Sequence, residues 1–163
     1  MIDASLRKAA TRVLERCRAR SLQVATAESC TGGLVAGALT EIAGSSDVVD
    51  HGFVTYSDAA KRAMLGVPAA TLKRHGAVSA QTAKAMAAGA LKYSRADLAV
   101  AITGIAGPGG GSKEKPVGLV YFAAASRSGR RLARKRVYGT IGRRRVRLAS
   151  VAEALSLLLR LAR

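Results

Sequence analysis

Thr26-Ala27-Glu28-Ser29-Cys30-Thr31-Gly32-Gly33 is the stretch that decides how the chain folds. An apolar run over residues 22–25 leads into it, and an apolar helical pattern follows the two glycines. This order predicts a buried strand, a tight turn and a helix, with the Ser29 hydroxyl at a sheet edge close to free backbone N–H groups. A serine there can act as a nucleophile beside an oxyanion site. The segment alone favours a second interpretation, in which Ser29 or Thr31 simply caps the helix.

Helical and extended patterns alternate on both sides of this turn. Apolar spacing of three and four predicts helices over residues 2–18, 31–42, 58–65, 69–74, 79–95 and 144–162. Apolar runs predict strands over residues 22–26, 48–56, 98–103, 117–126 and 131–138, the last two joined as a hairpin. We therefore expect an α/β protein: a single-domain layered α/β/α sandwich with a mixed sheet over residues 1–163.

The composition limits the class of protein. The 163 residues suffice for one domain with a substantial core, and four Tyr, two Phe and no Trp leave that core to small aliphatic side chains. No apolar run approaches the roughly 20 residues that span a bilayer, so no membrane partner is expected. The start of the sequence lacks the pattern of a secretory signal, and two cysteines are no disulfide framework. These features predict a cytoplasmic protein.

The formal net charge is +17, and the positive residues are unevenly placed. Eleven Lys or Arg and no Asp or Glu lie between Lys115 and Ala152. Such a field attracts anions such as nucleic acid, acidic headgroups or small phosphorylated molecules. No aromatic residues are interleaved with the arginines to stack on bases. We therefore favour a solvated basic surface, with nonspecific nucleic-acid binding, over a dedicated nucleic-acid face.

A glycine-rich loop, Gly104-Ile105-Ala106-Gly107-Pro108-Gly109-Gly110-Gly111, directly follows the apolar run 98–103. Glycine lets the backbone approach a ligand and turn its N–H groups towards an anion. The loop is neither a Walker A motif nor a dinucleotide fingerprint, because the closing Gly-Lys-Ser/Thr and the following helix are missing. Its place after a strand supports a binding role, and a flexible connector is an equally good interpretation.

Lys61, early in the helix predicted over residues 58–65, is a candidate general base. Most lysines on short helices are solvated, but burial can lower the pKa of a lysine enough for it to activate a serine. His51 and His75 form no persuasive Ser-His-Asp set, and Cys30 fits a buried packing role better than a nucleophile. No cluster of side chains has metal-ligand spacing, so no metal is expected.

Seven short motifs occur in order along the chain: Glu28–Gly33, Gly44–Ser46, Gly52–Ser57 with Lys61, Leu65–Val67, Gly76–Ser79, Thr103–Pro108 and Lys115–Gly118. Together they resemble the CinA C-terminal domain family over residues 5–162. The molybdopterin-binding-like domain that longer members carry has no counterpart in this sequence. The family includes stand-alone nicotinamide mononucleotide deamidases. The resemblance therefore implies a homo-oligomeric, cofactor-independent amidohydrolase of pyridine nucleotide recycling, which forms nicotinic acid mononucleotide and ammonia.

The resemblance also implies roles for individual residues. Ser29 resembles the nucleophile and Lys61 its base, with Ser46 and Tyr56 orienting the pair. The residues of this chain that resemble the family's substrate-binding positions are Thr31, Gly32, Thr103, Gly104, Ile105, Gly107 and Arg143. Before that arginine the family usually has Gly-Asp, whereas this chain has Ile141-Gly142, which leaves Arg143 less constrained and adds to the positive field.

The competing function is a non-catalytic binding module connected with competence or DNA damage. A protein of this charge binds nucleic acid at low salt whatever its function, so only selective binding at physiological salt would indicate such a module. A degenerate deamidase is a third alternative. The presence of the five residues expected in the machinery argues mildly against it: Ser29, Ser46, Tyr56, Lys61 and Thr103.

Overall fold

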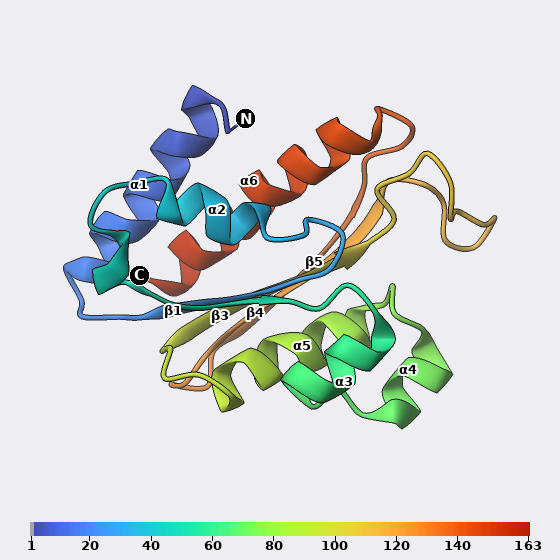
Figure 1. Ribbon diagram of the computed structural model, residues 1–163, viewed down its shortest axis with the longest axis horizontal. Helices are drawn as coiled ribbons and strands as arrows, with labels where there is room; N and C mark the ends of the chain where they lie inside the picture. Colours follow the sequence, from blue (N-terminus) through green and yellow to red (C-terminus); the bar gives the residue numbers. More distant parts are fainter. Residues whose placement is uncertain (1) are drawn as a thin grey trace.

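The computed structural model describes residues 2–163 as a five-stranded sheet between two layers of helices (Figure 1). The strands are β1 (Val24–Glu28), β2 (Val49–Val54), β3 (Leu98–Gly104), β4 (Leu119–Ser126) and β5 (Arg131–Val137). The helices are α1 (Ala4–Arg18), α2 (Leu34–Thr40), α3 (Asp58–Leu65), α4 (Ala69–His75), α5 (Ala80–Lys92) and α6 (Arg143–Leu161), with a 3-10 turn η1 (Ser45–Asp47).

The sheet is mixed, as predicted. Its strand order is β2-β1-β3-β4-β5; β1 runs parallel to β2 and β3, and β4 is antiparallel to β3 and β5. Helices α1, α2 and α6 cover one face, and α3, α4 and α5 cover the other (Figure 1). The predicted α/β/α sandwich is therefore confirmed. Within residues 2–163, none of the helices combines the length and apolar character needed to cross a membrane.

The two layers of the core differ in side-chain size. Leu, Val, Ile and Phe side chains fill the α1/α2/α6 layer, whereas the sheet residues under α5 are mostly alanines. These are Ala25, Ala27, Ala99, Ala101, Ala123 and Ala125. Small side chains let α5 lie close to the sheet, which explains how a chain with six aromatic residues fills its interior.

Some element boundaries differ from the predicted ones for local reasons. The predicted strand 22–26 begins two residues later, because the Leu22 N–H still bonds to the Cys17 carbonyl at the end of α1. The helix predicted from residue 31 begins at Leu34, because Gly32 and Gly33 have positive φ angles of 60° and 92°. The strand also ends two residues later than predicted, at Glu28, and this makes Ser29 the first residue after a buried strand.

The close approach of α5 and α3 depends on Gly89. A Cβ atom at this position would overlap the Leu65 carbonyl group, whereas a Cβ at Gly37 in α2 would meet nothing within 4 Å. We expect Gly89→Ala to lower the free energy of unfolding by about 1–3 kcal/mol through overpacking. Gly37→Ala should raise it by about 0.5–1 kcal/mol, because alanine is the better helix former. Urea titrations of both variants test this, and equal stabilities would contradict the packing account.

Candidate active site

Ser29 lies at the edge of the sheet where the carboxyl ends of β1, β2 and β3 meet. It is the first residue after β1, and its N–H bonds to the Ile102 carbonyl of β3 at 2.9 Å. The residue is 9% exposed and lines a cavity of about 260 Å³. Openings at the carboxyl ends of parallel strands are the usual ligand sites of α/β sheets.

The Glu28 carboxylate, fully buried before Ser29, holds the start of α2. It accepts hydrogen bonds from the N–H groups of Gly33, Val35 and Ala36 at 2.9–3.1 Å. The helix N-terminus therefore already carries an anion, and the expectation of free N–H groups there is wrong at these three positions. This role of Glu28 was not among the predictions, although an acidic residue at the end of an apolar run is a signal for one.

The capping interpretation of Ser29 and Thr31 is also wrong. The N-cap of α2 is Gly33, and no side chain at the cap position bonds to the helix. Thr31 is fully buried, and its hydroxyl has no hydrogen-bond partner among the described residues. The Ser29 hydroxyl does not bond to α2 and lies instead beside the Lys61 Nζ.

Lys61 faces Ser29 from the second turn of α3. Its Nζ lies 3.2 Å from the Ser29 Oγ, 3.1 Å from the Thr55 carbonyl oxygen and 3.5 Å from the Tyr56 carbonyl oxygen. The side chain is 1% exposed, and this burial lowers the pKa of Lys61 from its ordinary value of 10.5. Asp58, an exposed carboxylate 3.9 Å away, opposes the shift in pKa.

This arrangement suits a neutral amine acting as a base. An uncharged Nζ has two N–H bonds and one lone pair, and two carbonyl oxygens stand ready to accept the two N–H bonds. The lone pair is then left for the hydroxyl hydrogen of Ser29. A serine paired with a neutral lysine can act as a nucleophile with its own base.

Tyr56 and Arg143 form the rim of the same cavity. Arg143, the first residue of α6, donates to the Tyr56 hydroxyl at 3.0 Å and to the Gly107 carbonyl at 2.9 Å. Among the described residues, the hydrogen bond between Lys61 and Tyr56 uses the Tyr56 backbone carbonyl, and Tyr56 as a whole is 61% exposed where it lines the cavity. Arg143 therefore links α6 to the segment that follows β2 and to the glycine-rich loop.

The glycine-rich loop forms a wall of the cavity. Its lining includes Thr103, Gly104, Ile105 and Gly107, as the resemblance implied. The Thr103 hydroxyl donates to the Ala77 carbonyl at 2.8 Å, which ties the end of β3 to the segment before α5. The interpretation of this loop as a simple connector is therefore not favoured.

Three of the expected site residues do not line this cavity. Thr31 and Gly32 belong to the turn after Cys30 and are absent from the lining of the cavity. Ser46 is exposed in η1, which precedes β2, whereas the cavity lies where β2 ends. A strand therefore separates Ser46 from the Ser29–Lys61 pair, and within residues 2–163 no hydrogen bond joins Ser46 to either residue.

Arg147 was missed by the sequence analysis. Its Nε donates to the Cys30 carbonyl at 3.1 Å and its Nη2 to the Thr31 carbonyl at 2.8 Å. The available signal was its spacing of four from Arg143, which puts both arginines on one face of a helix. Cys30 itself is a packing residue: burial raises the pKa of its thiol to about 12. Within residues 2–163, no three His, Cys, Asp or Glu side chains are grouped to hold a metal.

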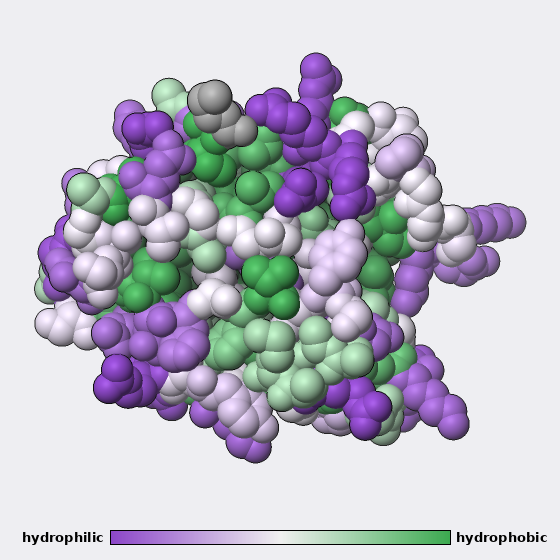
Figure 2. Space-filling model, viewed as in Figure 1, coloured by the Kyte–Doolittle hydropathy of each residue, from purple (hydrophilic) through white to green (hydrophobic). Residues whose placement is uncertain are grey.

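Many of the clustered arginines are engaged in the fold. Arg127 donates to the Leu91 and Ser94 carbonyls at the end of α5, and Arg130 donates to carbonyls at the end of α6. Arg136 pairs with Glu153 at 2.8 Å. Cations at helix C-termini stabilise them. Figure 2 shows hydrophilic side chains along much of the outline of the molecule, between apolar patches.

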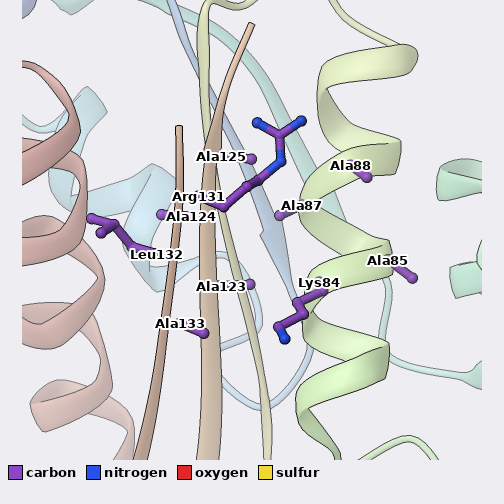
Figure 3. Close-up of a pocket in the computed structure, with 10 residues that line it drawn as sticks. All are labelled: Lys84, Ala85, Ala87, Ala88, Ala123, Ala124, Ala125, Arg131, Leu132 and Ala133. Atoms are coloured by element: carbon purple, nitrogen blue, oxygen red, sulfur yellow. The ribbon is translucent and has the colours of Figure 1, made fainter. Parts of the chain in front are cut away.

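A larger hollow of about 570 Å³ lies away from Ser29, between α5 and the β4–β5 hairpin (Figure 3). Alanines from both elements make up most of its lining, and the side chains of Lys84 and Arg131 stand at its sides (Figure 3). It contains no nucleophile and no acid–base pair. Of these two cavities, the smaller one is therefore the one that holds the Ser29–Lys61 pair.

Comparison with known proteins gives consistent results. The CinA C-terminal domain model matches residues 6–162. The chain is 52% identical over 138 residues to the nicotinamide-nucleotide amidohydrolase PncC of Escherichia coli (strain K12), covering 85% of this chain and 84% of that protein. It is 47% identical over 160 residues to the protein of the same name from Enterobacter agglomerans, covering 98% and 97%. The crystal structure of the competence/damage inducible protein CihA from Agrobacterium tumefaciens matches with a TM-score of 0.99 and 57% identity, covering 100% of this chain and 99% of that one.

Proposed function

The chain belongs to the CinA C-terminal domain family, and on this premise we propose that it hydrolyses nicotinamide mononucleotide to nicotinic acid mononucleotide and ammonia. The observation that carries the proposal is the 3.2 Å contact between the Lys61 Nζ and the Ser29 Oγ at a cavity. A carboxamide is a poor electrophile with a poor leaving group, so its hydrolysis needs an activated nucleophile and stabilisation of the oxyanion.

In the first half of the reaction, the neutral Lys61 amine takes the hydroxyl proton of Ser29 while the Ser29 Oγ bonds to the carboxamide carbon. The carbonyl oxygen becomes an oxyanion, and Cys30, which follows the nucleophile and lines the same cavity, offers its backbone N–H to it. The C–N bond then breaks as the Lys61 ammonium returns its proton to the departing nitrogen. The products of this half are ammonia and an ester between Ser29 and the carboxyl group of nicotinic acid mononucleotide.

In the second half, water attacks the ester and gives up one proton to Lys61. The carbon–Oγ bond breaks, the proton passes from Lys61 to the Ser29 oxygen, and nicotinic acid mononucleotide leaves. Lys61 ends neutral, as it began, so its lowered pKa serves both halves.

The phosphate of the substrate is proposed to bind at the Arg143 side of the cavity. The start of α2 is unsuitable because the Glu28 carboxylate already occupies its N–H groups. Arg143 and the glycine loop share the opposite wall, where a guanidinium and exposed peptide N–H groups can meet a dianion.

The test is to incubate the purified protein with nicotinamide mononucleotide and to measure ammonia and nicotinic acid mononucleotide together. We expect the two products in equal amounts. Nicotinamide riboside, which lacks the phosphate, is expected to be turned over with a KM raised at least about tenfold, the loss of one charge-assisted contact. An absence of ammonia with every pyridine nucleotide tried would refute the proposed function.

A further inference from the structure

We propose that Arg147 is a positioning residue for the oxyanion: it fixes, through two peptide groups, the direction of the Cys30 N–H. This inference rests on the proposed function, because the oxyanion arises when Ser29 attacks an amide. Arg147 lies outside the cavity lining, so it acts through the backbone and not by touching the substrate.

A continuous chain of bonds joins the guanidinium to that N–H. The Arg147 Nη2 holds the Thr31 carbonyl at 2.8 Å, and this carbonyl shares its peptide group with the Gly32 N–H. The Gly32 N–H donates to the Ser29 carbonyl at 3.0 Å, and that carbonyl shares its peptide group with the Cys30 N–H.

Because peptide groups are planar, this series of hydrogen bonds constrains the direction of the Cys30 N–H. Within residues 2–163 the one cis peptide bond is Gly107-Pro108, so both peptide groups of the turn are trans. In a planar trans peptide the C=O and N–H bonds point in opposite directions, and fixing one fixes the other. The hydrogen bond from Arg147 to the Thr31 carbonyl therefore determines where the Cys30 N–H points.

The Cys30 N–H makes no hydrogen bond to another residue among those the structure describes; its polar neighbour is the thiol of Cys30 itself, whose pKa it lowers against the effect of burial. In the part of the chain that the structure describes, it donates to no backbone carbonyl, although Cys30 is only 6% exposed. Buried N–H groups that bond to no other residue are rare in proteins, and a thiol is only a weak acceptor, so a ligand oxygen can replace it. Its position, one residue after the nucleophile and at the same cavity, suits a donor for the oxygen of an acyl group on Ser29.

The positive charge of Arg147 has a second effect, in addition to orienting the Cys30 N–H. It forms no ion pair with the acidic side chains of residues 2–163, and its Nε also holds the Cys30 carbonyl at 3.1 Å. A cation at one end of a hydrogen-bonded chain polarises each peptide along it, so the last N–H becomes a stronger donor.

Arg147 is not the only group that holds this turn in place. The Glu28 carboxylate independently anchors the N–H groups at the start of α2, and the Ser29 N–H is fixed to β3. Loss of Arg147 should therefore loosen the direction of one donor more than it loosens the site. This separates a positioning role from a merely structural one.

The experiment compares Arg147→Met, Arg147→Lys and the control Arg145→Met in steady-state ammonia release. Arg145 is an exposed arginine of the same helix, and no hydrogen bond joins it to the site. For Arg147→Met we expect kcat to fall about 10- to 100-fold with KM changed less than about twofold, the pattern of an interaction made in the transition state. Lysine at this position reaches one carbonyl, so Arg147→Lys should recover part of kcat.

The outcomes separate the two proposals. An inactive wild type overturns the proposed function and leaves no reaction for Arg147 to assist. An active wild type, with Arg147→Met equal to Arg145→Met, overturns the role of Arg147 alone. If circular dichroism shows Arg147→Met to be unfolded, Arg147→Lys decides: an effect confined to KM, or no effect, contradicts the inference.

Discussion

Replacement of Ser29 by alanine is expected to reduce ammonia release from nicotinamide mononucleotide by at least about four orders of magnitude, because loss of a covalent nucleophile removes the whole acyl-enzyme route. The change deletes one oxygen atom that lies 3.2 Å from the Lys61 Nζ and leaves the backbone of the turn in place. KM for the remaining turnover should stay close to that of the wild type, because the proposed phosphate contacts are untouched.

The matched control is Ser128→Ala, an exposed serine in the turn between β4 and β5. It should keep full turnover. Mass spectrometry of wild type quenched during turnover should show the ester of nicotinic acid mononucleotide on the peptide that contains Ser29. The neighbouring thiol is a poor competitor, since burial raises the pKa of Cys30 to about 12 and keeps it protonated. An ester on Cys30, or an active Ser29→Ala variant, would show that the nucleophile is assigned wrongly.

Much of the fold was predictable because its elements follow simple periodicities. The apolar run of β3 and the helical spacing of α6 appear in the sequence as a buried strand and a core-facing helix. The start of α2 moved because it is set by the backbone conformation at Gly32 and Gly33, which an apolar pattern does not encode. Positive φ angles there delay the helix and lengthen the turn that carries Ser29.

The site was predictable where one residue type is needed at one place, and less so where burial decides the role. Ser29 and Lys61 were identified as a pair, and the structure brings them into contact. Arg147 looked like one more member of a basic run, because its two carbonyl partners lie more than a hundred residues away in sequence. Ser46 shows the converse: it precedes β2, and the length of that strand separates it from the cavity.

Lys61→Met is expected to lower kcat by about 10²- to 10⁴-fold, the usual contribution of a positioned general base. Methionine occupies a similar volume without a proton acceptor, so the Ser29 hydroxyl stays protonated. Lys61→Arg should be as inactive, because a guanidinium does not lose its proton at any pH at which proteins are stable. Activity of either variant near that of the wild type would contradict the role of Lys61 as base.

The wild-type pH profile should reflect the same group. Catalysis requires the neutral amine, so kcat/KM is expected to fall as the pH drops below the pKa of Lys61, which burial holds under 10.5. In Asp58→Asn the carboxylate 3.9 Å from the Nζ loses its charge, so this acid limb should move to lower pH. The shift should be small and should shrink with added salt, because Asp58 is exposed.

The pH dependence of folding stability is an independent measure of the lowered pKa of Lys61. Below the lowered pKa, Lys61 is protonated in both folded and unfolded chains, so the native state bears the full cost of burying a cation. Between that pKa and 10.5 the unfolded chain binds more protons than the folded one, and the free energy of unfolding of the wild type rises with pH. The stability of Lys61→Met relative to the wild type should therefore be highest below the lowered pKa of Lys61 and should decline from there as the pH rises to 10.5, since all other titrating groups cancel in the difference. Urea titrations across this range measure it, and a difference independent of pH would mean that the Lys61 pKa is not lowered in the folded protein.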